Sequence, residues 1–472
     1  MVECRVTTMG AWTTRRQAGE PAPLGTAGIG SAAGAAASDG RMVTGGRLEG
    51  ERPAEAESAG RRFGALRHRN FTLLWGGLLL SNTGTWMQST AQGYLIYQLT
   101  SSPLALGLLG FSFAVPMLLL PPLGGVLADR VDRLALMRVT NVAWIVMTLA
   151  LAALTWLGQV TYWQILLVSF LGAVLLAFDN PTRQALVPDL VPRAALLSAI
   201  SLNAIVFTGA ALVGPAVAGL LLGAFGGDLY HGAAVVFLLN AASYLAVLVP
   251  LVLWIRLPPR QRAGPPASFG ADLLEGLRYV KSQRPLVLLL ALTAVTSIFG
   301  RSFSQLMPVF AEDVLRVGPD GLGLMYSAPG AGTLLGGAAL AALGHVGSRR
   351  RLVTGATVFF TLTILGFALS RLYPLSLALL FLSGLTGTIA GATIATLLQA
   401  KSPGRLRGRV MSLQTLAIIG MSPLGGLLSG ALATIVPAPL AVSATAAVIL
   451  VVLGLIVVTQ PAWQDVEANE GT

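Results

Sequence analysis

Residues 121–138, PPLGGVLADRVDRLALMR, place five charged side chains between two long apolar runs. The first run covers residues 104–128, and the second covers residues 135–157. Each is about as long as the 17–25 residues that a helix needs to cross the hydrocarbon core of a bilayer. The charged stretch is therefore interpreted as a short link between two membrane-spanning helices, and it either anchors the topology or belongs to a moving part.

The composition of the chain agrees with a membrane protein. Its 472 residues are 54% hydrophobic and 11% charged, with a mean hydropathy of +0.73. A soluble protein carries roughly 25% charged residues. The net charge of +11 does not indicate nucleic-acid binding, because the arginines lie in short links without a basic face and interleaved aromatic residues. The lone cysteine, Cys4, excludes a disulfide framework within the chain. The three histidines are far apart in the sequence and predict no metal site.

Twelve apolar segments predict an all-α polytopic membrane protein. They cover residues 71–97, 104–128, 135–157, 162–178, 194–223, 232–255, 286–307, 320–343, 352–370, 374–397, 408–434 and 439–459. Twelve spans put nearly all lysines and arginines on one side of the membrane, and the other side keeps only Arg316 and Arg371. Positive charge is enriched in cytoplasmic loops, so we expect a cell-membrane protein with both termini in the cytoplasm.

The polar stretches divide the chain into five parts. Residues 1–62 are expected to form a disordered cytoplasmic tail, unless synthesis begins at Met42. Residues 63–255 and 286–459 form two related bundles of six helices each, and residues 460–472 form a short cytoplasmic tail. The linker, residues 256–285, contains an amphipathic helix with Phe269, Leu273, Leu277 and Val280 on one face, as expected for a helix at a membrane surface.

The sequence resembles the major facilitator superfamily over about residues 63–459. Gly125 to Arg133, GVLADRVDR, resembles the signature loop of that superfamily between its second and third helices. Residues 82–110, 178–192, 275–286 and 406–413 resemble one branch, which contains enterobactin-type and macrolide-type exporters. The resemblance implies two pseudo-symmetric bundles that rock around a central cavity formed by the first, fourth, seventh and tenth helices.

The signature loop has a physical interpretation of its own. Gly125 permits close helix packing, and Asp129 at the membrane boundary can accept hydrogen bonds from a helix N-terminus and pair with arginine. The resemblance implies that this contact reaches the start of the eleventh helix, where Arg407 and Arg409 are the candidate partners. Arg130 and Arg133 would brace the loop, and Asp132 completes it. The alternative is a topology anchor, for which the arginines alone would suffice.

The fifth span contains Gly209, Gly214, Pro215 and Gly219. Their spacing resembles a glycine–proline motif of antiporters in this superfamily, with extra intervening residues. The alternative is ordinary close packing, because glycine and proline are common in membrane helices.

Polar side chains mark a candidate substrate cavity on the first and seventh spans. These are Asn82, Trp86, Ser89, Gln92, Ser297, Arg301 and Gln305. In hydrocarbon they must either bond to neighbouring helices or line a wet cavity. Arg301 either faces protein or water, or extends its side chain to the nearer membrane surface.

The leading functional hypothesis is proton-coupled export of amphiphilic drugs or siderophore-like compounds by a monomer in contact with membrane lipids. No phosphate-binding loop with lysine occurs, so we expect that ATP does not drive this chain and that no cofactor is needed. The resemblance to the exporter branch implies a proton gradient as the energy source. Asp179 is the candidate proton site, with Asp129 as a second candidate. An uptake permease or a lipid flippase of the same fold is the alternative. A membrane enzyme is disfavoured, because no converging nucleophiles or metal ligands occur.

Overall fold

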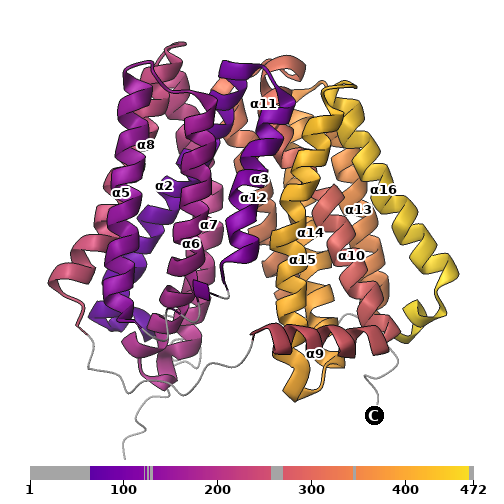
Figure 1. Cartoon of the computed structure of the whole chain (residues 1–472). Helices are drawn as coiled ribbons and strands as arrows, with labels where there is room; N and C mark the ends of the chain where they lie inside the picture. The colour runs from indigo at the N-terminus through magenta and orange to yellow at the C-terminus, as the bar shows by residue number, and fades with distance from the viewer. Residues whose placement is uncertain are drawn as a thin grey trace, which may run out of the picture. The chain divides into compact units, whose positions relative to one another are not determined.

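The computed structural model describes residues 64–121, 123–124, 127, 131–256, 269–343 and 347–466. Within these residues every regular element is a helix, which confirms the all-α fold (Figure 1). The predicted tail, residues 1–62, lies outside the described residues. So do Gly125, Asp129 and Arg130 of the signature loop.

Each of the twelve predicted spans overlaps an observed helix. The first half contains α2 (Arg69–Thr100), α3 (Pro103–Leu119), α5 (Arg133–Trp156), α6 (Tyr162–Leu190), α7 (Leu196–Ala224) and α8 (Leu229–Leu253). The second contains α10 (Arg284–Gly300), α12 (Gly318–Leu343), α13 (Arg349–Leu369), α14 (Tyr373–Lys401), α15 (Gly404–Leu432) and α16 (Ala438–Thr459). The short elements are η1 (Gly64–Arg67), η2 (Arg193–Ala195), α9 (Phe269–Ser282), η3 (Ser302–Leu306), α11 (Met307–Val309), η4 (Phe310–Val314) and η5 (Pro461–Val466).

In the described part of the chain, nine helical segments are long and apolar enough to cross a membrane, and α3 is a shorter apolar helix. Helices α2 and α12 are long enough but fall outside this group, because α2 carries many polar residues and α12 many glycines. Helix α6 continues to Leu190, well beyond residue 178, where the sequence analysis ended the span. The helix continues because the polar residues Asp179 and Thr182 are buried rather than placed in a loop.

Helix starts coincide with capping residues. The side chain of Ser102 accepts from the Ala105 amide before α3, and Pro103 occupies the first turn. Asp132 accepts a 3.0 Å hydrogen bond from the Leu134 amide and so caps α5. Ser348 caps α13 through the Arg351 amide at 3.2 Å. These side chains satisfy amide groups that have no partner inside a helix, and they fix where each span begins.

The same pattern of helix packing occurs in both halves. In the first half, α2 packs on α7 and α8, α3 on α6, and α5 on α6 and α8. In the second half, the equivalent helices pair in the same way: α10 with α15 and α16, α12 with α14, and α13 with α14 and α16. Between the halves, α3 packs on α15 and α7 packs on α12. Because α3 is the equivalent of α12 and α7 the equivalent of α15, these two contacts are also related by the pseudo-symmetry. The packing is that of two pseudo-symmetric bundles.

Buried apolar side chains form three clusters. Figure 1 places α9 at one end of the helices, here called the α9 end, and α11 at the other, the α11 end. One cluster near the α11 end contains residues of both bundles, among them Tyr94, Leu106, Phe310 and Met325. A second cluster, around Met137 and Leu251, belongs only to the first bundle, and a third, around Leu289 and Trp463, belongs only to the second. The bundles therefore share a core at the α11 end and have separate cores at the α9 end.

Glycines bring the bundles into close contact. A Cβ atom on Gly219 of α7 would lie 2.6 Å from the carbonyl oxygen of Pro319 in α12, and a Cβ on Gly323 would lie 2.5 Å from the carbonyl oxygen of Pro215. Between α3 and α15, a Cβ on Gly107 would lie 3.0 Å from the carbonyl oxygen of Gly426. Small residues of this kind allow membrane helices to approach through their backbones.

A short helical turn after α16 packs on the second bundle. Residues 461–466 form η5, and the Trp463 side chain is 1% exposed within the third cluster. The sequence predicts a short cytoplasmic tail over residues 460–472, and residues 461–466 of that segment form η5.

The Gly219 contact generates a test. We expect Gly219→Ala to lower the melting temperature in detergent, because its methyl group would overlap a backbone carbonyl of α12 and overpacking costs about 1–3 kcal/mol. Gly209→Ala is the matched control, since no atom lies within 4 Å of a Cβ there. Equal melting temperatures for the two variants would contradict the close contact.

Candidate functional site

The seventh span is a broken helix. Helix α10 ends at Gly300, and Arg301 begins an irregular passage through η3, α11 and the π-helical turn η4. The apolar segment at residues 286–307 predicts one continuous helix, and this prediction is wrong beyond Gly300. Broken helices in membrane proteins occur where the backbone is buried in protein or lines a cavity, and they are often found at transport sites.

Side-chain hydroxyls from three other helices stabilise the break. Tyr326 of α12 donates a 3.0 Å hydrogen bond to the carbonyl of Ser304. Ser429 of α15 donates to the carbonyl of Ser302 at 3.3 Å, and the Ser302 hydroxyl donates to Thr445 of α16 at 3.3 Å. A backbone group without a partner is costly in a membrane, so these contacts allow α10 to interrupt its regular hydrogen bonding.

The predicted cavity residues of the second bundle occupy different environments. Ser297 is buried, whereas Arg301 is exposed. Within the described residues the Arg301 guanidinium has no hydrogen bond or ion pair, so its charge is available at the break. Gln305 is inserted between the two bundles, because Cβ atoms on Gly110 of α3 and Gly426 of α15 would each lie 2.6 Å from its side chain.

The predicted cavity residues of α2 also differ from one another. Asn82 donates a 2.7 Å hydrogen bond to Leu78 in its own helix. Trp86 packs edge-on against Phe207 of α7, with ring centroids 6.0 Å apart. Ser89 is exposed. Gln92 is buried, and its Nε2 has no hydrogen-bond partner in the described structure, so this amide can still donate to a ligand.

Other polar residues of α2 bond to α8 instead of lining a cavity. The amide nitrogen of Asn240 donates to Gln88 Oε1 at 2.6 Å, with both residues buried. The hydroxyls of Thr85 and Tyr244 lie 2.9 Å apart. The polar residues of α2 therefore divide into those that form hydrogen bonds within the protein, the exposed Ser89, and Gln92 with its unbonded amide nitrogen.

Of the signature loop, the structure describes Asp132 and Arg133. Asp132 caps α5, as noted above. Arg133 donates to the Asp189 carboxylate at 2.9 Å and to the Ala185 carbonyl at 2.7 Å, which joins α5 to α6. The Arg133 side chain is 11% exposed, so it packs mainly against its own bundle.

The two arginines expected to meet Asp129 have other partners. Arg409 forms an ion pair with Glu275 of α9, and Arg405 lies 3.9 Å from the same carboxyl group. Arg407 donates to the carbonyl of Gln399 at 3.1 Å. Tyr279 of α9 also donates to the Lys401 carbonyl at 3.3 Å. The linker helix is thus docked on the start of α15, and a contact of either arginine with Asp129 stays a prediction.

The residues of the glycine–proline motif make separate contacts. Gly209 faces open space, and Gly214 packs against α2, where its Cβ would lie 2.6 Å from Trp86 Cβ. Pro215 and Gly219 contact α12, as described above. In the described structure this motif is a packing surface that touches both the first bundle and the second.

Asp179 is buried between α5 and α6. Its Oδ1 accepts a 3.0 Å hydrogen bond from Thr140, whose hydroxyl also lies 3.0 Å from the Met137 carbonyl. This geometry suits both protonation states, because the Thr140 proton can point to either oxygen while a protonated Asp179 donates to Thr140. Arg183, one turn later, bonds to Asn180.

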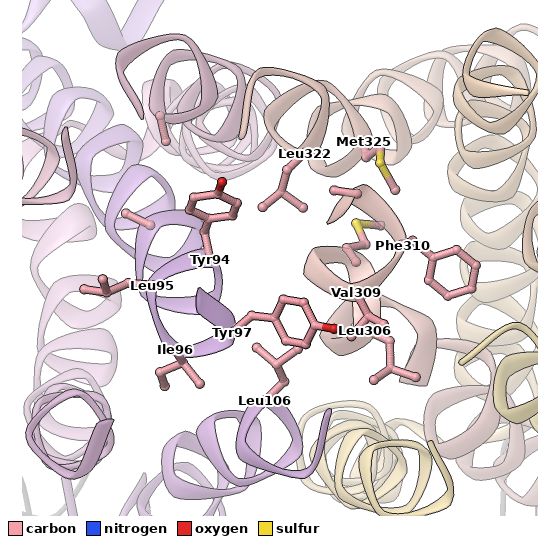
Figure 2. Packing of buried hydrophobic residues seen from close by; sticks show 14 of the residues in the cluster. Tyr94, Leu95, Ile96, Tyr97, Leu106, Leu306, Val309, Phe310, Leu322 and Met325 are labelled. Atoms are coloured by element: carbon pink, nitrogen blue, oxygen red, sulfur yellow. The ribbon is translucent and has the colours of Figure 1, made fainter. Parts of the chain in front are cut away.

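A hydrogen bond joins the bundles at the α11 end. The hydroxyl of Tyr97 in α2 donates to the carboxylate of Asp313 in η4. Figure 2 shows Tyr97 directed away from α2 and toward the segment that carries Leu306 and Val309. The sequence analysis did not assign Asp313 to a site. Its position in an acidic pair beside the seventh span was a signal, but its partner lies 216 residues away.

The family profile described as transmembrane secretion effector matches residues 61–470. The chain belongs to this family, a branch of the major facilitator superfamily. Like other members of the superfamily, it is a multi-pass membrane transporter and not an enzyme. The described residues contain no group of three or more histidine, cysteine, aspartate or glutamate side chains that could hold a metal ion.

Two relatives confirm the resemblance to the efflux branch. Macrolide efflux protein A of Streptococcus pyogenes is 23% identical over 362 residues, which cover 76% of this chain and 88% of the relative. The enterobactin exporter EntS of Shigella boydii is 25% identical over 335 residues, which cover 71% of this chain and 77% of the relative.

Solved structures confirm the fold. The chain is similar to an inward-facing bacterial homologue of the lysosomal transporter Spinster, with a TM-score of 0.64 and 16% sequence identity. The similarity covers 84% of this chain and 97% of that structure. At this identity the comparison concerns architecture alone.

The break in α10 generates a test. Tyr326→Phe removes the donor to the Ser304 carbonyl, and the loss of one such hydrogen bond costs about 1 kcal/mol. We expect a lower melting temperature than for Tyr230→Phe, a control whose hydroxyl has no hydrogen bond in the described residues. An unchanged melting temperature for Tyr326→Phe would show that the broken backbone does not depend on this hydroxyl.

Proposed function

We propose that this transporter exports amphiphilic drugs or siderophore-like compounds across the cell membrane in exchange for protons. The observation that carries the proposal is the distribution of the apolar clusters, which the bundles share at the α11 end and keep separate at the α9 end. Such a packing is the one expected of a transporter that loads cargo from the α9 side. Rocking of the bundles would then open the shared contact at the α11 end and form a new contact at the α9 end.

The orientation of the chain is compatible with the proposed direction of transport. Helices α5, α10 and α13 each begin with arginine at the α9 end, which favours a cytoplasmic position for that end and for both termini. Loading from the α9 side would therefore collect cargo from the cytoplasm or inner leaflet. The names of the two relatives, a macrolide efflux protein and an enterobactin exporter, support the same direction.

Three side chains are the leading candidates for contact with cargo. Ser89 and Arg301 are exposed, and Gln92 keeps an unused amide donor. Together they would offer hydrogen bonds and one positive charge, which suits compounds with hydroxyl, carbonyl or anionic groups. A single chain contains both bundles, so a monomer surrounded by lipid is sufficient for this mechanism.

Protons are the proposed energy source, and no cofactor is required. One proton that moves inward at 100 mV supplies about 2.3 kcal/mol from the potential alone, which supports roughly fifty-fold accumulation. Asp179 is the proposed proton carrier, because it is buried and its hydrogen bond with Thr140 suits both protonation states.

Everted membrane vesicles test the direction and the coupling. With an acidified lumen we expect labelled erythromycin or enterobactin to accumulate in vesicles that contain the protein, because proton efflux from the lumen would drive cargo in. A protonophore should abolish the accumulation, and vesicles without the protein provide the background. Accumulation only when the outside is acidic would contradict export and favour an uptake permease.

The proton site has a test of its own. We expect Asp179→Asn to abolish accumulation driven by the pH gradient while downhill exchange of the same labelled cargo continues, since the carboxamide cannot bind and release a proton at neutral pH. Asp228→Asn is the control, because this exposed carboxylate caps α8 and pairs only with His231 in the first turn of the same helix. Normal gradient-driven accumulation by Asp179→Asn would exclude Asp179 as the carrier.

A further inference from the structure

A cavity of about 560 Å³ opens at the α11 end, where the two bundles meet. Five segments line it: the end of α2, the start of α3, the α11–η4 passage, the link before α14 and the link between α15 and α16. Its volume lies within the range of about 300–1,000 Å³ that is usual for small-molecule sites. None of its lining residues belongs to the substrate cavity predicted from the sequence.

Two opposite charges face this cavity without pairing with each other. Asp313 lines one part and Arg371 another, and both are exposed. Asp313 accepts the hydrogen bond of Tyr97, whereas the Arg371 guanidinium has no hydrogen bond or ion pair within the described residues. Since the described structure shows no ion pair between Asp313 and Arg371, both charges are available to a ligand in the cavity.

The cavity lining also carries hydroxyl groups and a residue with a left-handed backbone. Ser101, Ser102 and Thr434 line the cavity. Ser101 adopts a left-handed backbone conformation with φ 48°, which is uncommon for a residue other than glycine, and its amide bonds to the Tyr97 carbonyl at 2.7 Å. This is the usual conformation of a helix C-cap, and it fixes the end of α2 beside the cavity.

We infer that this cavity is a binding site for zwitterionic molecules, with an ammonium group at Asp313 and a carboxylate or similar anion at Arg371. Each contact would be a charge-assisted hydrogen bond, and the hydroxyl groups would add neutral ones. The identification of the ligand as departing cargo rests on the proposed export function, whereas the binding site itself does not.

The site is linked to the contact between the bundles. An ammonium group at Asp313 weakens the hydrogen bond that the same carboxylate accepts from the Tyr97 hydroxyl of α2, because it neutralises the charge of the acceptor. A ligand that binds more tightly when this bond is broken shifts the population toward the state without it. Occupancy of the cavity therefore favours separation of the bundles at the α11 end.

Fluorescence titration of the purified full-length chain in lipid nanodiscs tests the site. The probes are Nε-dansyl-lysine, a zwitterion, dansylcadaverine, a cation, and dansylglycine, an anion. We expect dansyl-lysine to bind most tightly, and Asp313→Asn and Arg371→Gln each to weaken it about tenfold or more. Asp313→Asn should remove the advantage of dansyl-lysine over dansylglycine, and Arg371→Gln its advantage over dansylcadaverine.

Matched controls separate the site from general charge effects. Asp320→Asn and Arg316→Gln change the same charges at the same end of the molecule, outside the cavity lining, and should leave the affinity for dansyl-lysine unchanged. Tyr97→Phe removes the competing hydroxyl and should tighten dansyl-lysine binding severalfold, an effect that mere loss of structure would not produce.

Three results would overturn the inference: equal affinities for the three probes, variants at Asp313 and Arg371 that bind like the controls, or weaker binding by Tyr97→Phe. The titration uses no ion gradient and no transport. A positive titration would therefore support the binding site even if the vesicles show no export. A negative titration would overturn the binding site and leave the export proposal untouched.

Discussion

The shared apolar cluster at the α11 end holds the two bundles of this transporter together, while each bundle keeps a core of its own at the α9 end. Inside a bilayer, burying an apolar side chain gives no gain from water, so cohesion between helices depends on close packing and a few hydrogen bonds. Gly107, Gly219 and Gly323 supply that packing by letting backbones touch. A contact of this type is lost as soon as the surfaces separate slightly, which makes it suitable for a joint that opens and closes.

The break in α10 places irregular backbone next to this joint. Tyr326, Ser429 and Thr445 hold the break from three different helices of the second bundle, so its geometry is fixed by that bundle as a whole. The opposite side of the same passage bears on the first bundle, through Gln305 against Gly110 and Asp313 with Tyr97. A movement between the bundles therefore directly shifts the passage that begins at Arg301, and with it this exposed charge.

The sequence predicted the features that depend on local pattern. Apolar length located the twelve helices and the family motifs identified the superfamily, and the periodicity of residues 269–280 predicted the linker helix. Features that depend on distant partners were not accessible. Nothing near Arg409 indicates that Glu275, from another element, is its partner, and Asp313 and Arg371 meet one cavity only because five segments converge there. The end of α10 at Gly300 was missed because the hydroxyls that make the break tolerable come from other helices.

Helix α9 belongs to the second bundle, since Glu275, Gly276 and Tyr279 all contact the start of α15 or the residues just before it. The covalent tether between the bundles is thus reduced to residues 257–268. A gene divided within that stretch would encode two polypeptides, each with a full set of helices for one bundle. Their reassembly would rely on the non-covalent contacts between the bundles, which are the glycine contacts, the shared apolar cluster and the hydrogen bond from Tyr97 to Asp313. The molecule is therefore organised as a non-covalent pair of bundles encoded as one chain.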